Sequence, residues 1–150
     1  MHFSLWQYRL KPFFALLLSC AILLSACLGC RFVYAMKFSA LQGERTFYLY
    51  HSSSNALQKE KLSFLDVFYV QGESVCFAIE NSARQTVEEI FAKYNGVAYM
   101  QEDAGGTVSV YGFAPGLYNG VMIDGKNINL HVAVKDGRCV VGSPIIFGGF

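Results

Sequence analysis

Residues 36–150 lack the spacings by which metal-binding and nucleotide-binding proteins are most readily recognised. They contain no C-x-x-C and no H-E-x-x-H, and no Gly-Lys-Ser or Gly-Lys-Thr follows Gly105-Gly106 or Gly148-Gly149. The missing Cys and His spacings argue against a zinc site, and the missing Gly-Lys motif argues against a phosphate-binding loop. We therefore expect no metal and no cofactor, and we interpret both glycine pairs as turn or tail residues.

The same region has no cluster of basic side chains. It contains nine Lys and Arg residues, scattered along the chain, against eleven Asp and Glu residues, which gives a net charge of −2. A protein that binds the phosphate backbone of a nucleic acid needs several clustered Lys or Arg residues to displace counterions. The composition therefore predicts no nucleic-acid partner.

One stretch near the N-terminus lacks charge altogether. Residues 12–30 are 19 predominantly apolar residues, with Arg9 and Lys11 before them and Arg31 after them. At 1.5 Å per residue, a helix of this length just spans a hydrocarbon core of roughly 30 Å, whereas a buried core helix would be shorter and would show a polar face. We interpret residues 1–35 as a signal or transmembrane segment that places the remainder on the extracytoplasmic side of the cell membrane.

Three fates of this segment are open. Leu24-Ser25-Ala26-Cys27 resembles the lipobox of bacterial lipoproteins, in which the cysteine is lipidated and becomes the mature N-terminus. Val33-Tyr34-Ala35 instead has small or apolar residues at the spacing that an ordinary signal peptidase recognises. If neither site is cut, the segment remains as a membrane anchor, which is the leading interpretation.

A linker over residues 36–43 and one small α+β domain over residues 44–150 are predicted to follow. Runs rich in β-branched and aromatic residues, separated by Gly, Asp, Asn or Pro, predict short strands of an antiparallel sheet. Gly72 is interpreted as a turn residue with positive φ between two hairpin strands, and residues 56–62 as a loop or a single turn. The expected strands cover residues 44–51, 64–70, 74–79, 97–101, 107–114, 120–123, 127–134 and 138–141.

The clearest helix covers residues 82–94, and we expect it to be the main cover of the sheet. Ser82 and Gln85 have the spacing of a capping box, and Asn95-Gly96 supplies a C-terminal stop. Residues at helical spacing form an apolar stripe, which should pack against the sheet. The stripe comprises Val87, Ile90, Phe91 and Tyr94.

Two cysteines, Cys76 and Cys139, lie in the predicted domain. Outside the membrane they could form a disulfide bond. The alternative is a pair of buried free thiols that act as small apolar residues, and two cysteines alone have no spacing that decides between these alternatives.

Two groups of polar residues in the domain are candidates for a binding or catalytic site. In residues 127–134 apolar and polar side chains alternate, so Asn127, Asn129 and His131 are predicted to share one face of a half-buried strand, either as a polar binding face or as a solvated one. His51 next to Ser52–Ser54 is the other candidate for acid-base chemistry. Adjacent residues at a strand end point apart, so a polar strand terminus explains them better.

The C-terminal tail is unusually apolar for a chain end. Ile145, Ile146, Phe147 and Phe150 would be exposed to solvent unless they dock onto the domain. We interpret the tail as a last segment that covers the core, with an apolar patch for a partner as the alternative.

Four strings in the domain resemble a known family. They are FYLYHSSS (47–54), QGESV (71–75), NINLHVAV (127–134) and VGSPIIFGGF (141–150). Together they resemble the YwmB family, also called TATA-box-binding-like, of small proteins from endospore-forming bacteria. The resemblance covers about residues 44–150, and its two C-terminal strings are the more specific.

The resemblance implies an N-terminal membrane segment, an α+β domain similar to the TATA-box-binding fold, and an association with sporulation. It implies no activity and no catalytic residues, because likeness of fold does not transfer function. A TATA-box-binding fold has two similar halves, and at most one such half can be recognised in this sequence. A homodimer and a simpler sheet-plus-helix domain are therefore both open.

These observations predict a non-enzymatic binding or structural module of the cell envelope, associated with sporulation. Its expected partners are the membrane, through residues 1–35, and an envelope protein or ligand. The alternative is an extracytoplasmic enzyme that acts on an envelope substrate, with His51 or His131 as the base.

Overall fold

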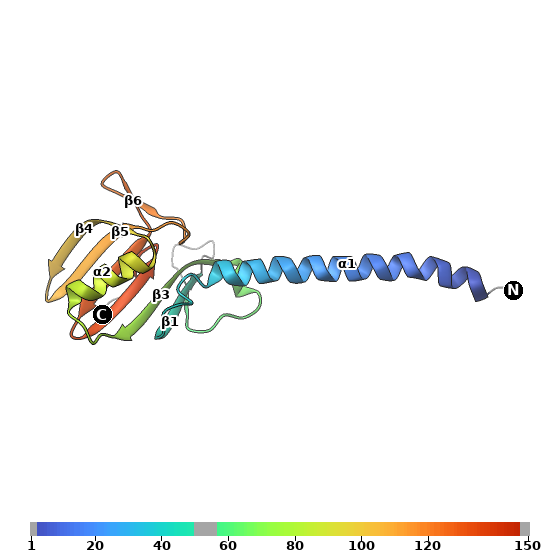
Figure 1. Cartoon of the computed structure of the whole chain (residues 1–150), viewed down its shortest axis with the longest axis horizontal. Coiled ribbons are helices and arrows are strands. Elements are labelled where there is room, and N and C mark those ends of the chain that lie inside the picture. The colour runs from blue at the N-terminus through green and yellow to red at the C-terminus, as the bar shows by residue number, and fades with distance from the viewer. Residues whose placement is uncertain (1–2, 50–56, 148–150) are drawn as a thin grey trace. The chain divides into compact units, whose positions relative to one another are not determined.

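The computed structural model describes residues 3–49 and 57–147 of the chain (Figure 1). The chain divides into two compact units, residues 1–34 and residues 35–150. The first unit contains nearly all of helix α1 (Phe3–Ala35), and the second is an α+β domain.

Helix α1 is apolar and solvent-exposed. Its segment Lys11–Ala35 is long and apolar enough to cross a membrane, and Leu16 and Ile22 are largely exposed. The hydroxyl of Ser25 donates to the carbonyl of Ala21 at 2.8 Å, so this polar group is satisfied within the helix itself. The helix is therefore consistent with a signal sequence or a membrane anchor.

The domain is built on a seven-stranded antiparallel sheet with the strand order β2-β1-β3-β9-β8-β5-β4. Its strands are β1 (Glu44–Leu49), β2 (Leu57–Lys59), β3 (Val70–Ala78), β4 (Val97–Ala104), β5 (Thr107–Phe113), β8 (Leu130–Lys135) and β9 (Arg138–Ser143). The strands β6 (Val121–Ile123) and β7 (Lys126–Ile128) form a separate hairpin, and a 3₁₀ turn, η1 (Asp66–Phe68), precedes β3. The predicted α+β class, an apolar N-terminal helix followed by an antiparallel sheet with one further helix, is confirmed.

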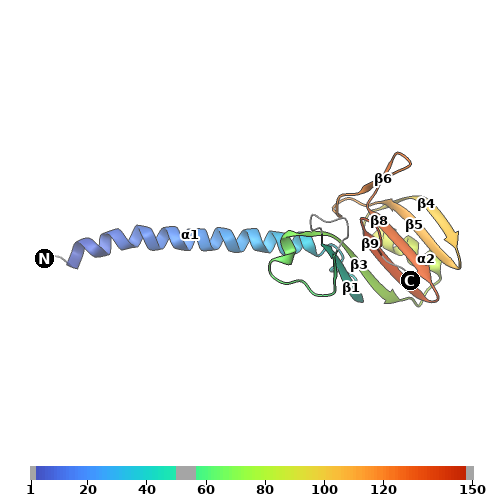
Figure 2. The same ribbon diagram turned by 180° about the vertical axis from the view of Figure 1, so that it is seen from behind.

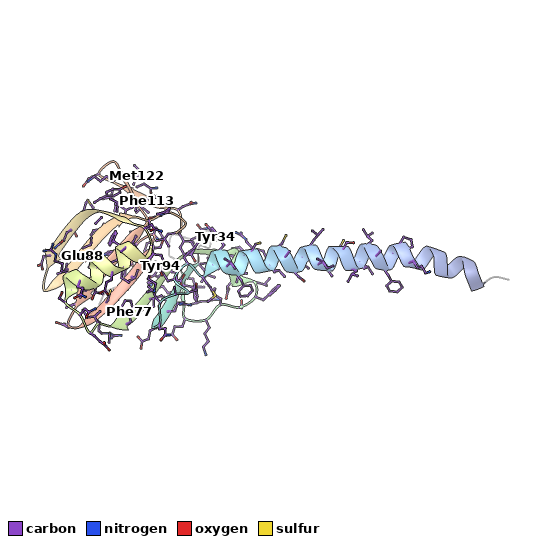
Figure 3. The ribbon with its side chains drawn as sticks, viewed as in Figure 1. Tyr34, Phe77, Glu88, Tyr94, Phe113 and Met122 are labelled. Carbon is purple, nitrogen blue, oxygen red and sulfur yellow. The ribbon has the colours of Figure 1, made fainter. Side chains whose placement is uncertain are left out.

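Helix α2 (Ala83–Lys93) lies across one face of the sheet (Figure 1). It begins where predicted, because the Ser82 hydroxyl accepts a hydrogen bond from the Gln85 N–H at 3.3 Å. Val87, Ile90 and Phe91 of the predicted stripe are buried in one core with residues of β8, and Tyr94 is partly buried against it. Each fully buried side chain contributes about 1.5–3 kcal/mol before the loss of entropy. Tyr94 ends the helix and contacts Phe38 edge to face, with ring centroids 5.3 Å apart (Figure 3).

Residues 36–43 pack into the domain, which differs from the linker expected from the sequence. Phe38 and Leu41 are buried in the same core as α2. The N–H of Phe38 donates to the Glu73 carboxylate at 3.1 Å, and Arg45 donates to the carbonyls of Phe38 and Leu41. Arg45 also pairs with Glu73 at 3.0 Å. This buried ion pair therefore joins the segment that follows α1 to the centre of the sheet.

The predicted hairpin around Gly72 is wrong. Residues 70–78 form one strand, β3, in which Gly72 lies opposite Tyr48 and has no positive φ. A Cβ at Gly72 would lie 2.6 Å from the carbonyl oxygen of Ser143, so the glycine permits close approach of two backbones rather than a turn. The short strand β2 lies within residues 56–62, where a loop or a turn was expected.

Residues 127–134 are also not the single half-buried strand that their alternation suggested. They contain the end of β7 and most of β8, with Asn129 between the two strands. Strand β8 is buried on both faces: Leu130 and Val132 face the core beneath α2, and His131 lies on the opposite face, where Ile146 covers it. The chain after β9 therefore converts an expected open face into a partly covered one.

Candidate functional site

Figure 2 shows the sheet face opposite α2, with β1, β3, β9 and β8 side by side. This face carries a groove. Side chains two residues apart on a strand share a face, and the register places Thr46 opposite Ser74 and Cys76 opposite Val140. These residues come from β1, β3 and β9, and they form the floor of a cavity of about 410 Å³. The size falls within the range of ordinary ligand pockets.

The C-terminal tail forms one wall of this groove. The N–H of Phe147 donates to the hydroxyl of Tyr48 at 3.3 Å, and the two rings meet edge to face with centroids 5.0 Å apart. Gln58, from β2, donates to the carbonyl of Phe147 at 2.9 Å. Ile146 and Phe147 thus dock on the groove face of the sheet, whereas the sequence predicted a cover for the core, and Phe150 lies outside the described residues.

The docked tail requires a glycine beneath it. A Cβ at Gly142 would lie 2.7 Å from the Ile146 side chain and 3.0 Å from its backbone nitrogen. Because the tail packs directly on the β9 backbone at this point, Gly142 permits a contact that any larger residue would obstruct.

Charged side chains lie at the other end of the groove, where β8 turns into β9. Lys135, Asp136 and Arg138 contribute to the lining, and Arg138 pairs with Glu44 at 3.2 Å on the exposed surface. The groove therefore has two cations and the Asp136 carboxylate at one end, an aromatic and aliphatic wall at the other, and hydroxyl groups between them. The full lining comprises Thr46, Tyr48, Gln58, Ser74, Cys76, Lys135, Asp136, Arg138, Val140, Ile146 and Phe147.

The three residues predicted to form a polar face are not brought together. Asn127 is exposed on β7, whereas Asn129 is buried and acts as a brace. The Asn129 side chain accepts from the Ala114 N–H at 2.7 Å and donates to the carbonyls of Ala114 at 2.9 Å and Tyr118 at 3.3 Å. Asn129 therefore holds the segment that leaves β5. These three hydrogen bonds use both the oxygen and the NH₂ group of its side chain.

His131 is buried under the tail. Its ring stacks on Tyr111 with centroids 4.2 Å apart, and its Nδ1 accepts the N–H of Ile146 at 3.3 Å. Burial lowers the pKa of His131 to about 4, so the imidazole is neutral at pH 7. A neutral Nδ1 that accepts a backbone N–H is suited to holding the tail in place.

Cys76 and Cys139, for which a disulfide bond and a pair of free thiols were both open from the sequence, are free thiols on opposite faces of the sheet. Cys139 lies opposite Phe77 in the core, while its neighbour in the ladder, Cys76, lies opposite Val140 on the groove face. Burial, with a smaller contribution from Cys76, raises the pKa of Cys139 to about 12. The thiols point apart because side chains alternate along each strand, so a bond between them would require backbone movement. Cys27 is a free, exposed thiol on α1, and its lipidation stays a prediction.

The hydroxyls of Tyr48 and Ser74 hydrogen-bond to each other at 2.7 Å. Within residues 3–49 and 57–147, no imidazole or carboxylate hydrogen-bonds to either hydroxyl, and no three His, Cys, Asp or Glu side chains are grouped to hold a metal ion. The catalytic candidates His51 and Ser52–Ser54 lie outside the described residues.

Comparison with protein-family models, with curated proteins and with solved structures gave no match for this chain. The resemblance to the YwmB family and the homodimer therefore stay predictions.

Sequence reasoning did not find the groove, although two of its signals are visible in the sequence. Thr46 and Tyr48 alternate with apolar residues in the first strand, as do Ser74 and Cys76 in the third. Both alternations predict a face less apolar than its reverse. Their alignment side by side depends on the β1–β3 register, which local patterns do not specify.

Proposed function

We propose that this protein is a non-enzymatic, membrane-anchored module whose groove binds an extended segment of an envelope protein on the extracytoplasmic side. The observation that carries this proposal is the combination of an exposed apolar helix with a lined groove in the following domain. The association with sporulation belongs to the same proposal and is supported only by the resemblance of the domain sequence to the YwmB family.

The lining indicates the chemistry of the ligand. Phe147 and Ile146 would contact an apolar side chain. Lys135 and Arg138 would contact a carboxylate, in competition with Glu44, which pairs with Arg138, and with Asp136 at the same end of the lining. The hydroxyls of Thr46 and Ser74 lie between these ends and can hydrogen-bond to a peptide backbone. An acidic peptide segment with an apolar residue a few positions away matches this order of groups.

Site-specific photocrosslinking of the full-length chain in its own cells tests the proposal. A photoreactive amino acid at Thr46 should give a protein adduct, and one at Glu88 on α2, which projects from the covered side of the sheet, should not (Figure 3). Arg138→Glu should abolish the Thr46 adduct. Arg84→Glu is the matched control, because Arg84 is also an exposed arginine paired with a glutamate.

Three results would count against the proposal. The first is the same adduct from Thr46 and Glu88. The second is a reporter, fused behind Phe150, that proves active only in the cytosol. The third is hydrolysis of an envelope substrate by the protein, with loss of activity in His131→Ala or His51→Ala, which would establish the enzymatic alternative instead.

A further inference from the structure

A small apolar surface surrounds the 3₁₀ turn η1, between β2 and β3. Phe64 is 56% exposed, Leu65 66%, Phe68 41% and Tyr69 47%. These four residues, the η1 patch, lie within six consecutive positions, which concentrates large apolar side chains at one place on the domain. A local cluster of this kind marks an interaction surface more often than isolated exposed residues do.

The geometry of η1 holds these side chains outward. Val67 is buried in the turn. The Asp66 carboxylate accepts a hydrogen bond from the Ser63 N–H at 2.7 Å and forms a hydrogen-bonded ion pair with the Lys59 ammonium at 2.9 Å. Because Asp66 and Val67 fix the inner side of the turn, the residues on either side are directed to the surface. The patch is therefore prearranged by the fold.

The η1 patch lies beside the point at which the chain enters the domain. Ala35, the last residue of α1, is buried in the same cluster as Val67 and Val70. The hydroxyl of Tyr118 donates to the carbonyl of Ala35 at 2.8 Å, which fixes this entry point within the domain. The chain therefore enters the domain at the cluster of buried residues from which the η1 patch projects.

We propose that the η1 patch inserts into the interfacial region of the same bilayer that holds α1. Aromatic and aliphatic side chains, tyrosine included, favour the boundary between headgroups and acyl chains. Lys61 is exposed just before the patch and can contact anionic headgroups. This second contact, which rests on α1 being retained as an anchor, would hold the domain in one orientation on the membrane.

Depth-dependent fluorescence quenching of the full-length chain in vesicles tests this contact. Trp6, the only tryptophan, is replaced by Phe, and a single tryptophan is introduced by Phe64→Trp or, as control, by Met122→Trp. Met122 is also exposed, on the β6–β7 hairpin (Figure 3). Vesicles of phosphatidylcholine and phosphatidylglycerol are prepared with and without bromine near the top of the acyl chains. Retention of the protein is measured by flotation.

In floated protein, brominated lipid should reduce the emission of Phe64→Trp and leave that of Met122→Trp unchanged. The double change Leu65→Ser and Phe68→Ser, with Phe64→Trp, should lose this quenching while the protein still floats. Floated protein in which Phe64→Trp is not quenched overturns the η1 contact alone, and a protein neighbour at the patch would give this result. Protein that does not float overturns the anchor as well.

Discussion

Removing the Glu73 carboxylate should destabilise the domain far more than removing an exposed carboxylate. Glu73 is 0% exposed, pairs with Arg45 at 3.0 Å and accepts the N–H of Phe38 at 3.1 Å. In Glu73→Ala the guanidinium of Arg45 loses its counterion inside the protein, and the buried N–H of Phe38 loses its acceptor. Breaking a buried pair by removing one partner costs about 3–5 kcal/mol, which includes the cost of the uncompensated groups.

Two further variants separate charge from hydrogen bonding. Glu73→Gln retains an oxygen that can accept the N–H of Phe38, so its loss of stability should be smaller than that of Glu73→Ala. Burial raises the pKa of Glu73, and the N–H of Phe38 and the charge of Arg45 only partly oppose this effect. Between pH 4.5 and the raised pKa of the folded state, Glu73 holds a proton that the unfolded chain releases, so this group lowers stability as pH rises through that range. The Gln variant should lack that decline.

Thermal unfolding of the full-length chain in detergent, followed by near-ultraviolet circular dichroism of its aromatic residues, measures these effects. For a domain of this size the loss in Glu73→Ala corresponds to a fall in Tm of roughly 10–20 °C. Glu44→Ala, which removes the exposed partner of Arg138, is the control and should change stability by about 0–1 kcal/mol. If Glu73→Ala were no less stable than Glu44→Ala, the buried pair would not hold residues 36–43 on the sheet.

Three other predictions concern the tail and the N-terminal segment. The pKa of His131 is about 4 in the folded state, so between pH 6.5 and 4 only the unfolded chain binds a proton at this residue. The free energy of unfolding should therefore fall by about 3 kcal/mol as pH decreases through this window. Urea unfolding of His131→Phe should lack this pH dependence. Gly142→Ala should displace Ile146 and increase cleavage of the tail by carboxypeptidase, whereas Gly29→Ala, where a Cβ would contact nothing and the backbone has no positive φ, should not; equal cleavage would refute the tail contact. The intact mass of the mature protein should equal that of the uncleaved chain, while a mass beginning at a lipidated Cys27 or after Ala35 would establish the other fates.

The apolar helix and helix α2 could be predicted because their signals are local. Charge is absent from residues 12–30, and Ser82, the α2 stripe and Asn95-Gly96 lie within a few helical turns of one another. Interactions between residues three or four apart are decided by sequence spacing alone. The α+β class followed from the same kind of evidence, since alternation and turn residues mark most of the strands.

What the tertiary structure decided depends on residues distant in sequence. Gly72 could be recognised as a strand residue only once Ser143 lay against it, and the burial of His131 required Ile146 to fold back over β8. Cys76 and Cys139 lie on opposite faces because of the register between β3 and β9. The groove arises in the same way, because strand order and register, set by packing across the whole sheet, bring its lining residues together.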